Sequence, residues 1–163
     1  MDANVLAQLA LLSITLSVIT IVDIRTQTIP DIATAVLALA GLAVQAIVSL
    51  EALQWAVTSG LIYFLFFWAV RQGHWRLTGR LGMGFGDVKL AGAAGIWLAP
   101  GLLPAFIGVA ALSALLSVSA VAVYAGAGVM RRRIPFGPFL ALSLLVCWLL
   151  KMSNLGLEAL YAI

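Results

Sequence analysis

Charged side chains are scarce in this chain. Only 9% of its 163 residues are Asp, Glu, Lys or Arg, whereas 64% are hydrophobic and the mean hydropathy is +1.15. A soluble domain of this size cannot bury so much apolar surface, so the composition predicts a polytopic membrane protein. The net charge of +3 requires no nucleic-acid partner, because basic residues at the cytoplasmic ends of membrane helices produce such an excess.

The residue types that build metal centres and nucleophilic sites are equally rare. The chain has one cysteine, Cys147, and one histidine, His74. A single cysteine excludes an intramolecular disulfide and a Cys-x-x-Cys metal site. The histidine lies in a basic connection, away from Cys147, so we expect no Cys-His pair for nucleophilic catalysis. Two or three aspartates offer too few ligands for a metal ion, and we expect neither metal nor cofactor.

What the sequence does contain is a series of apolar runs, which predict an all-α fold with six transmembrane helices in one domain, 1–163. The expected helices cover about 5–22, 32–50, 55–70, 88–99, 102–129 and 136–150, with a short tail helix around 155–163. The first run lacks the basic region of a signal peptide, so it is expected to be a retained helix. The run 88–99 rises only about 18 Å, too little to cross the bilayer alone. The glycine-rich stretch before it must therefore enter the membrane, inside protein or beside water.

Basic residues alternate between the expected connections. They are Arg25 in the first connection, then Arg71, Arg76, Arg80 and Lys89 in or beside the third, and Arg131, Arg132 and Arg133 in the fifth. The second connection carries only Glu51, and the fourth carries no charge. This pattern predicts six crossings with both termini outside and the basic connections at the cytoplasmic face. Lys151 is the one basic residue that does not fit the alternation.

Three of the six acidic residues lie at the ends of expected helices, and the predicted topology puts all three at the cytoplasmic face. Asp23 ends the first helix. It either pairs with Arg25, although residues two apart on a helix do not face each other, or it is a functional intramembrane carboxylate. Asp31 follows Pro30 and is expected to cap the second helix and organise the loop before it.

The third acid, Asp87, follows a glycine-rich stretch, Gly82-Met83-Gly84-Phe85-Gly86. An acid at this position can cap a helix and complement its dipole. A cap does not require three glycines, whereas a substrate backbone lying against the loop would. We therefore expect Asp87 to serve both as a cap and as a functional carboxylate.

Two carboxylates that face each other share a proton, so one acts as general base on a water and the other as general acid. Asp23 and Asp87 thus indicate aspartic peptidase chemistry. Intramembrane aspartates beside a broken helix also suit a small proton- or cation-coupled transporter, and this alternative stays open. The chain halves show no internal symmetry, which counts against the transporter.

Three segments resemble the type IV prepilin peptidases. Gly84-Phe85-Gly86-Asp87, continued as Val88-Lys89-Leu90, is similar to the GxGD motif of that family of aspartic peptidases. Asp23-Ile24-Arg25 through Ile29-Pro30-Asp31 resembles its first aspartate motif. Ile134-Pro135-Phe136-Gly137-Pro138-Phe139-Leu140-Ala141 resembles its C-terminal motif.

The resemblance implies an endopeptidase that removes the short basic leader from prepilins, pseudopilins or related signal sequences of type IV pilus and protein secretion systems. It implies Asp23 and Asp87 as the catalytic pair, and a substrate helix that approaches through the lipid bilayer. It also implies that the protein lies in the cytoplasmic (inner) membrane of a prokaryote. The residues expected to bind substrate or shape the site are Gly84, Phe85, Gly86, Lys89, Pro30 and Asp31. Longer family members carry an N-terminal extension and a cysteine-rich insert associated with N-methylation. With a single cysteine here, we expect peptidase activity alone.

Overall fold

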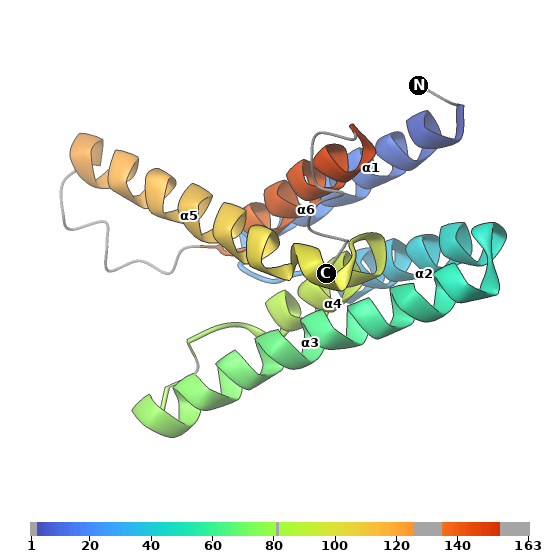
Figure 1. Ribbon diagram of the computed structural model, residues 1–163. Coiled ribbons are helices and arrows are strands. Elements are labelled where there is room, and N and C mark those ends of the chain that lie inside the picture. Colours follow the sequence, from blue (N-terminus) through green and yellow to red (C-terminus); the bar gives the residue numbers. More distant parts are fainter. Residues whose placement is uncertain (1–2, 81, 126–134, 154–163) are drawn as a thin grey trace.

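The computed structural model describes residues 3–80, 82–125 and 135–153 (Figure 1). Its helices are α1 (Ala3–Thr26), α2 (Asp31–Val48), α3 (Leu50–Thr78), α4 (Phe85–Trp97), α5 (Leu103–Ala125) and α6 (Gly137–Met152), with a 3-10 turn, η1 (Pro100–Leu102), before α5. The described residues contain helices and no strand, which confirms the all-α prediction. The expected tail helix at 155–163 and the run Arg131–Arg133 lie outside the described residues.

The helices lie where the apolar runs predict them, except that α3 is longer than expected. It continues to Thr78 and includes Arg71 and Arg76, which were assigned to a connection. Polar side chains do not end a helix by themselves. The helix stops at Gly79, whose φ of 68° gives the left-handed C-cap that glycine adopts without steric cost.

Among the described residues, four helical segments are long and apolar enough to cross a membrane: α1, α2, α3 and Pro100–Val123. The protein is therefore a multi-pass membrane protein. Helix α6 has 16 residues, and α4 has 13 and rises only about 20 Å. These lengths do not decide whether α4 and α6 cross completely, so the number of six crossings stays a prediction.

The short helix α4 lies at the centre of the described bundle, between α2 and α3 on one side and α6 on the other (Figure 1). Nine of its 13 residues are buried, and small side chains allow this close packing. At Gly95 an added Cβ would lie 2.7 Å from the carbonyl oxygen of Ser59 and 2.9 Å from Cα of Gly60. The small residues of α4 therefore form a close-packing surface against α3.

The C-terminal end of α4 is buried, and the carbonyl groups of its last residue and of the two residues that follow receive hydrogen bonds from neighbouring helices. The donors are Ser59 Oγ to Leu98 O (2.9 Å), Tyr63 Oη to Ala99 O (3.1 Å) and Lys151 Nζ to Trp97 O (3.2 Å). Backbone carbonyls at a helix end have no partner within the helix and are costly to leave unpaired away from water. These bonds explain how so short a helix ends inside the protein.

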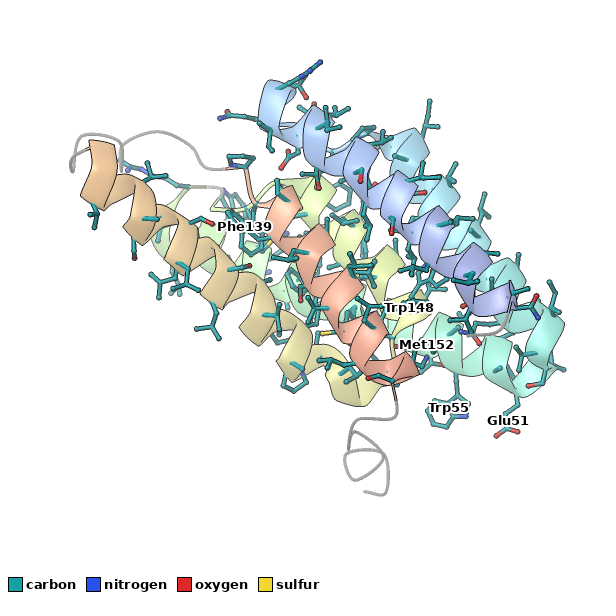
Figure 2. The ribbon with its side chains drawn as sticks, turned by 90° about the horizontal axis from the view of Figure 1, so that it is seen from above. Glu51, Trp55, Phe139, Trp148 and Met152 are labelled. Carbon is teal, nitrogen blue, oxygen red and sulfur yellow. The ribbon has the colours of Figure 1, made fainter. Side chains whose placement is uncertain are left out.

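The described helices alternate in direction, so that their connections gather at two ends of the bundle. Figure 2 shows Glu51 and Trp55, at the start of α3, near the same end as Met152 at the end of α6, whereas Phe139 lies toward the opposite end of α6. The start of α1 also lies at the Glu51 end (Figure 1). The last residues of α1 and α3 and the first residues of α4 and α6 therefore meet at the other end.

Candidate functional site

A cavity of about 680 Å³ opens where α1 and α3 end and where α4 and α6 begin. Both Asp23 and Asp87 line it, as predicted from their positions at helix ends. The cavity is lined by Asp23, Gln27, Arg71, Gly82, Met83, Gly84, Phe85, Asp87, Pro135 and Phe136. Its lining residues therefore include members of all three segments that resemble prepilin peptidase motifs.

Asp23 is 4% exposed and is positioned by the start of α6. Its Oδ2 atom accepts a hydrogen bond of 2.9 Å from the backbone N–H of Gly137, the first residue of that helix. The free N–H groups and the dipole at a helix N-terminus favour a carboxylate there. Arg25 is exposed and forms no ion pair with Asp23. The alternative in which Asp23 serves only to pair with Arg25 is thus wrong.

Asp87 is 9% exposed and is the third residue of α4. Its Oδ2 atom accepts a hydrogen bond of 3.2 Å from the backbone N–H of Gly84, which immediately precedes the helix. This is the acidic half of a capping box, and it confirms the predicted cap. The same side chain lines the cavity, so Asp87 caps α4 and is also accessible from the cavity.

The glycine loop is held in place by contacts that leave little room for side chains. A Cβ at Gly82 would lie 2.8 Å from the ring of His74, and one at Gly86 would lie 3.0 Å from Cβ of Ile29. His74 is also hydrogen bonded through Nδ1 to the carbonyl oxygen of Arg80 at 2.9 Å. The single histidine thus anchors the loop, and it is not among the residues that line the cavity.

Phe85 forms part of the cavity wall, and its ring contacts two cations. Its ring centroid lies 5.6 Å from the guanidinium carbon of Arg71 and 5.3 Å from Nζ of Lys89. The ring of Phe64 meets it edge to face, with the two centroids 6.2 Å apart. A cation over an aromatic face is attracted by the ring quadrupole, so these contacts fix the ring in position.

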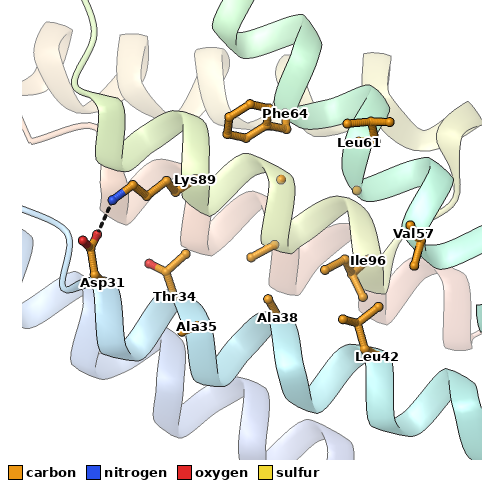
Figure 3. Close-up of a pocket in the computed structure, with 13 residues that line it drawn as sticks. Asp31, Thr34, Ala35, Ala38, Leu42, Val57, Leu61, Phe64, Lys89 and Ile96 are labelled. Carbon is orange, nitrogen blue, oxygen red and sulfur yellow. Dashed lines mark hydrogen bonds and ion pairs between the residues drawn. The ribbon is translucent and has the colours of Figure 1, made fainter.

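Lys89 and Asp31 lie on a different side of α4 from the cavity. They sit at one end of an apolar groove of about 570 Å³ between α2, α3 and α4 (Figure 3). Lys89 Nζ donates to Asp31 Oδ1 at 2.7 Å. Residues two apart on a helix face different sides, which explains why Asp87 and Lys89 separate in this way.

The prediction that Asp31 caps α2 is wrong. Pro30 occupies the N-cap position, and no side chain forms a cap hydrogen bond there. Instead, the carbonyl oxygen of Pro30 accepts from both the N–H and the hydroxyl of Thr34, each at 3.1 Å. Asp31 is the first residue of the helix, and its carboxylate is directed to Lys89. Pro30 is not among the residues that line the cavity or the groove.

Three residues that line the cavity or hold its acids were not identified from the sequence. Gln27 lies four residues after Asp23, a helical spacing that could have indicated it, and its φ of 53° places it in the left-handed region. Arg71 was counted only as a loop charge. Gly137 was part of a recognised motif, but its contact with Asp23 links residues 114 apart and has no local signal.

Comparison with known proteins gives consistent results. The model of the type IV leader peptidase family matches residues 10–126. The chain is similar to a "Prepilin leader peptidase/N-methyltransferase" of Burkholderia pseudomallei (strain 1026b), with 36% identity over 120 residues that cover 74% of this chain and 38% of the relative. Proteins of the same name from Aeromonas hydrophila and Escherichia coli (strain K12) are 33% and 32% identical, covering 82% and 85% of this chain and 46% and 57% of the relatives. No solved structure gave a significant match.

The chain thus spans between 38% and 57% of the length of these relatives. The family match includes both Asp23 and the GxGD segment that ends in Asp87. Those two segments are also the ones that the structure brings to a single cavity. The chain belongs to the type IV leader peptidase family.

Proposed function

We propose that the chain is a membrane-embedded aspartic endopeptidase that removes the basic leader from prepilins, pseudopilins or related signal sequences. The observation that carries this proposal is the convergence of Asp23 and Asp87, from α1 and α4, on one cavity in a chain of the type IV leader peptidase family. The curated relatives are named as prepilin leader peptidases, and family membership supports a similar activity here.

In this proposal the two aspartates form the catalytic pair. One carboxylate, ionised, takes a proton from a water whose oxygen attacks the carbonyl carbon of the scissile peptide bond. The other, protonated, donates its proton to the carbonyl oxygen, which gives a tetrahedral diol. When the diol collapses, the first carboxyl passes the proton that it took from water to the leaving amine, and the second carboxylate takes a proton back from a diol hydroxyl, which restores the starting pair. The hydrogen bonds from Gly137 and Gly84 hold the two groups in place, and such positioning supplies a large part of catalysis by general acid and base.

We further propose that the substrate cleavage site enters at the cytoplasmic face of an inner membrane, with both termini of this single domain outside and six crossings. In support, five of the six described basic residues belong to the end of the bundle that holds the cavity, namely Arg25, Arg71, Arg76, Arg80 and Lys89; the sixth, Lys151, lies at the other end. Positive residues favour the cytoplasmic side. Gly84, Phe85 and Gly86 are proposed to accommodate the substrate backbone beside Asp87.

The experiment is leader cleavage in membranes by Asp23→Ala and Asp87→Ala variants, each made singly. Both should lose at least a hundredfold in rate, because the dyad needs both carboxylates, while Glu51→Gln should cleave like the wild type. Glu51 is exposed and lies at the far end of the bundle (Figure 2), which makes it a matched control for loss of one acid. Substantial cleavage by either aspartate variant would refute the assignment.

A further inference from the structure

The apolar groove between α2, α3 and α4 is separate from the cavity that holds Asp23 and Asp87. Its volume is about 570 Å³, and no described residue lines both hollows. Apolar side chains such as Phe64 and Ile96 form its walls (Figure 3), and the groove opens outward beside the exposed Ala35. Water is a poor occupant of an apolar hollow. In a membrane, this groove therefore calls for an apolar occupant.

The groove is about half as long as the hydrocarbon core of a bilayer is thick. Along α2 it extends from Asp31 to Leu42, which is about 16 Å at 1.5 Å per residue. The hydrocarbon core measures about 30 Å, so the groove matches the leaflet at the cavity end of the bundle. The spanning helix of a partner would cross both leaflets and need a groove about twice as long. The length therefore favours a lipid acyl chain over a helix.

Two opposite charges lie at the end of the groove that faces the membrane surface. Lys89 Nζ donates to Asp31 Oδ1 at 2.7 Å, and the two side chains are 35% and 74% exposed. An ammonium has three donors and a carboxylate about four acceptor sites, so each group can bind a further partner. The pair is neutral as a whole. It complements a headgroup that carries both an anion and a cation with N–H donors, whereas a purely anionic headgroup would also meet the carboxylate of Asp31.

We infer that the groove binds one acyl chain of a phospholipid whose headgroup carries a phosphate and a primary ammonium, as in phosphatidylethanolamine. A phosphate oxygen accepts from Lys89, and the ammonium donates to Asp31, so that both bonds are charge-assisted. The acyl chain then extends along α2 from Asp31 toward Leu42. This inference is independent of the proposed peptidase function, because no residue of the catalytic pair takes part in it.

The headgroup preference can be measured by native mass spectrometry of the full chain, delipidated in detergent and incubated with two phospholipids of identical acyl chains. Phosphatidylglycerol lacks a cation, and the quaternary ammonium of phosphatidylcholine has no N–H. The wild type should bind phosphatidylethanolamine at least about threefold better than either, a ratio in the range that exposed charge pairs supply. Equal binding, or a preference for phosphatidylglycerol, would overturn the inference.

Variants of the charged pair connect this preference to the groove. In Asp31→Asn the ratio of phosphatidylethanolamine to phosphatidylglycerol should fall to about one, because Lys89 then binds either phosphate and the ammonium has lost its anionic partner. Lys89→Gln should weaken binding of phosphatidylethanolamine itself by about threefold. Arg76→Gln is the matched control, since Arg76 is exposed at the same end of the bundle and does not line the groove. It should keep the wild-type ratio. An unchanged ratio in Asp31→Asn would place the headgroup elsewhere and overturn the site.

The position of the acyl chain can be tested by photolabelling in nanodiscs, using phosphatidylethanolamine with a diazirine midway along one chain. Labels should concentrate on α2 and α4, and Ala35→Phe, which fills the groove, should remove most of them. Ala111→Phe is the matched control, because Ala111 is exposed on α5 and does not line the groove. It should label like the wild type. Labels spread evenly over all helices, or unchanged in Ala35→Phe, would overturn the site. Labelling of the groove by an apolar helical peptide but not by the lipid would assign it to a helix instead.

Discussion

The two central carboxylates differ in how they are held. Asp87 is fixed locally, by the N–H of a residue three positions earlier in the chain. Asp23 instead receives its hydrogen bond from Gly137 on α6. The geometry of the pair therefore depends on the docking of α6 against the end of α1, and α6 contributes to the site although it carries no acid that lines the cavity.

This dependence gives a prediction for Gly137→Ala. The added Cβ would lie 2.6 Å from Oδ2 of Asp23, so the carboxylate must move. Because the clashing atom is the end of a side chain, the fold should tolerate the change. Displacing a catalytic group by about 1 Å costs roughly a hundredfold in rate, and we expect a loss of this order in leader cleavage with an unchanged thermal unfolding midpoint.

The control for Gly137→Ala is Gly73→Ala, where an added Cβ meets nothing within 4 Å. It should cleave like the wild type. Wild-type activity in Gly137→Ala would show that the position of Asp23 does not depend on this contact.

The ion pair between Asp31 and Lys89 is expected to have a small effect. The two side chains are 74% and 35% exposed, and exposed pairs contribute about 0–1 kcal/mol. Asp31→Ala should retain at least a tenth of the cleavage activity, and so should Lys89→Ala. A double-mutant cycle measured by unfolding should give a coupling below about 1 kcal/mol. Complete loss of activity in a folded Asp31→Ala protein would place Asp31 in the chemistry.

At the scale of single residues, sequence reasoning found the acids and missed the groups that surround them. Asp23 and Asp87 could be identified because a carboxylate at the end of an apolar helix is costly and calls for a function. Arg71 could not be identified, because its place in the cavity wall depends on α3 continuing past the apolar run. The prediction that Asp31 caps α2 is wrong because Lys89, 58 residues away, offers the carboxylate a cationic partner.

At the scale of elements, α4 presents Asp87 at the cavity from its first turn and ends inside the protein. Ser59, Tyr63 and Lys151 provide hydrogen bonds for the carbonyl groups at its last residue and just after it. Its small residues allow α3 to approach until backbone meets backbone. The position of Asp87 relative to the other helices therefore depends on the packing between α3 and α4.

Gly95→Ala tests this packing. The added Cβ would meet backbone atoms of Ser59 and Gly60 at 2.7 and 2.9 Å, and backbone cannot rotate away as a side chain can. Overpacking of this kind costs roughly 1–3 kcal/mol, so the thermal unfolding midpoint in detergent micelles should fall. Gly108→Ala on α5, where a Cβ meets nothing within 4 Å, should leave the midpoint unchanged or raise it. Equal midpoints for the two variants would contradict the packing argument.

The positions of the helices could be predicted because long apolar runs have few other stable structures in a membrane. The predicted ends of the helices are less accurate, because the residue at which a helix ends depends on single residues such as Gly79 and on contacts with other parts of the chain. The end of α3 shows this: Arg71 and Arg76 are polar yet helical, and the chain turns only where glycine permits a positive φ.

At the scale of the whole molecule, Lys151 was the one basic residue that did not fit the predicted orientation. The structure places its Nζ atom 3.2 Å from the carbonyl oxygen of Trp97, at the end of α4. A cation at a helix C-terminus complements the dipole and binds free carbonyls. The hydrogen bond to Trp97 thus explains why Lys151 lies at the predicted outer end. The remaining described basic residues follow the alternation.

Orientation can be measured with single cysteines and a membrane-impermeant maleimide. The wild type is the control, because Cys147 is buried and should not react. Exposed residues at the predicted outer connections and end, replaced in turn as Glu51→Cys, Gly101→Cys and Ser153→Cys, should be labelled on intact cells. Thr28→Cys and Arg80→Cys, at the cavity end, should be labelled only after the membrane is opened. Labelling of Arg80→Cys on intact cells would place the cavity outside, where a basic leader that remains in the cytoplasm could not reach it.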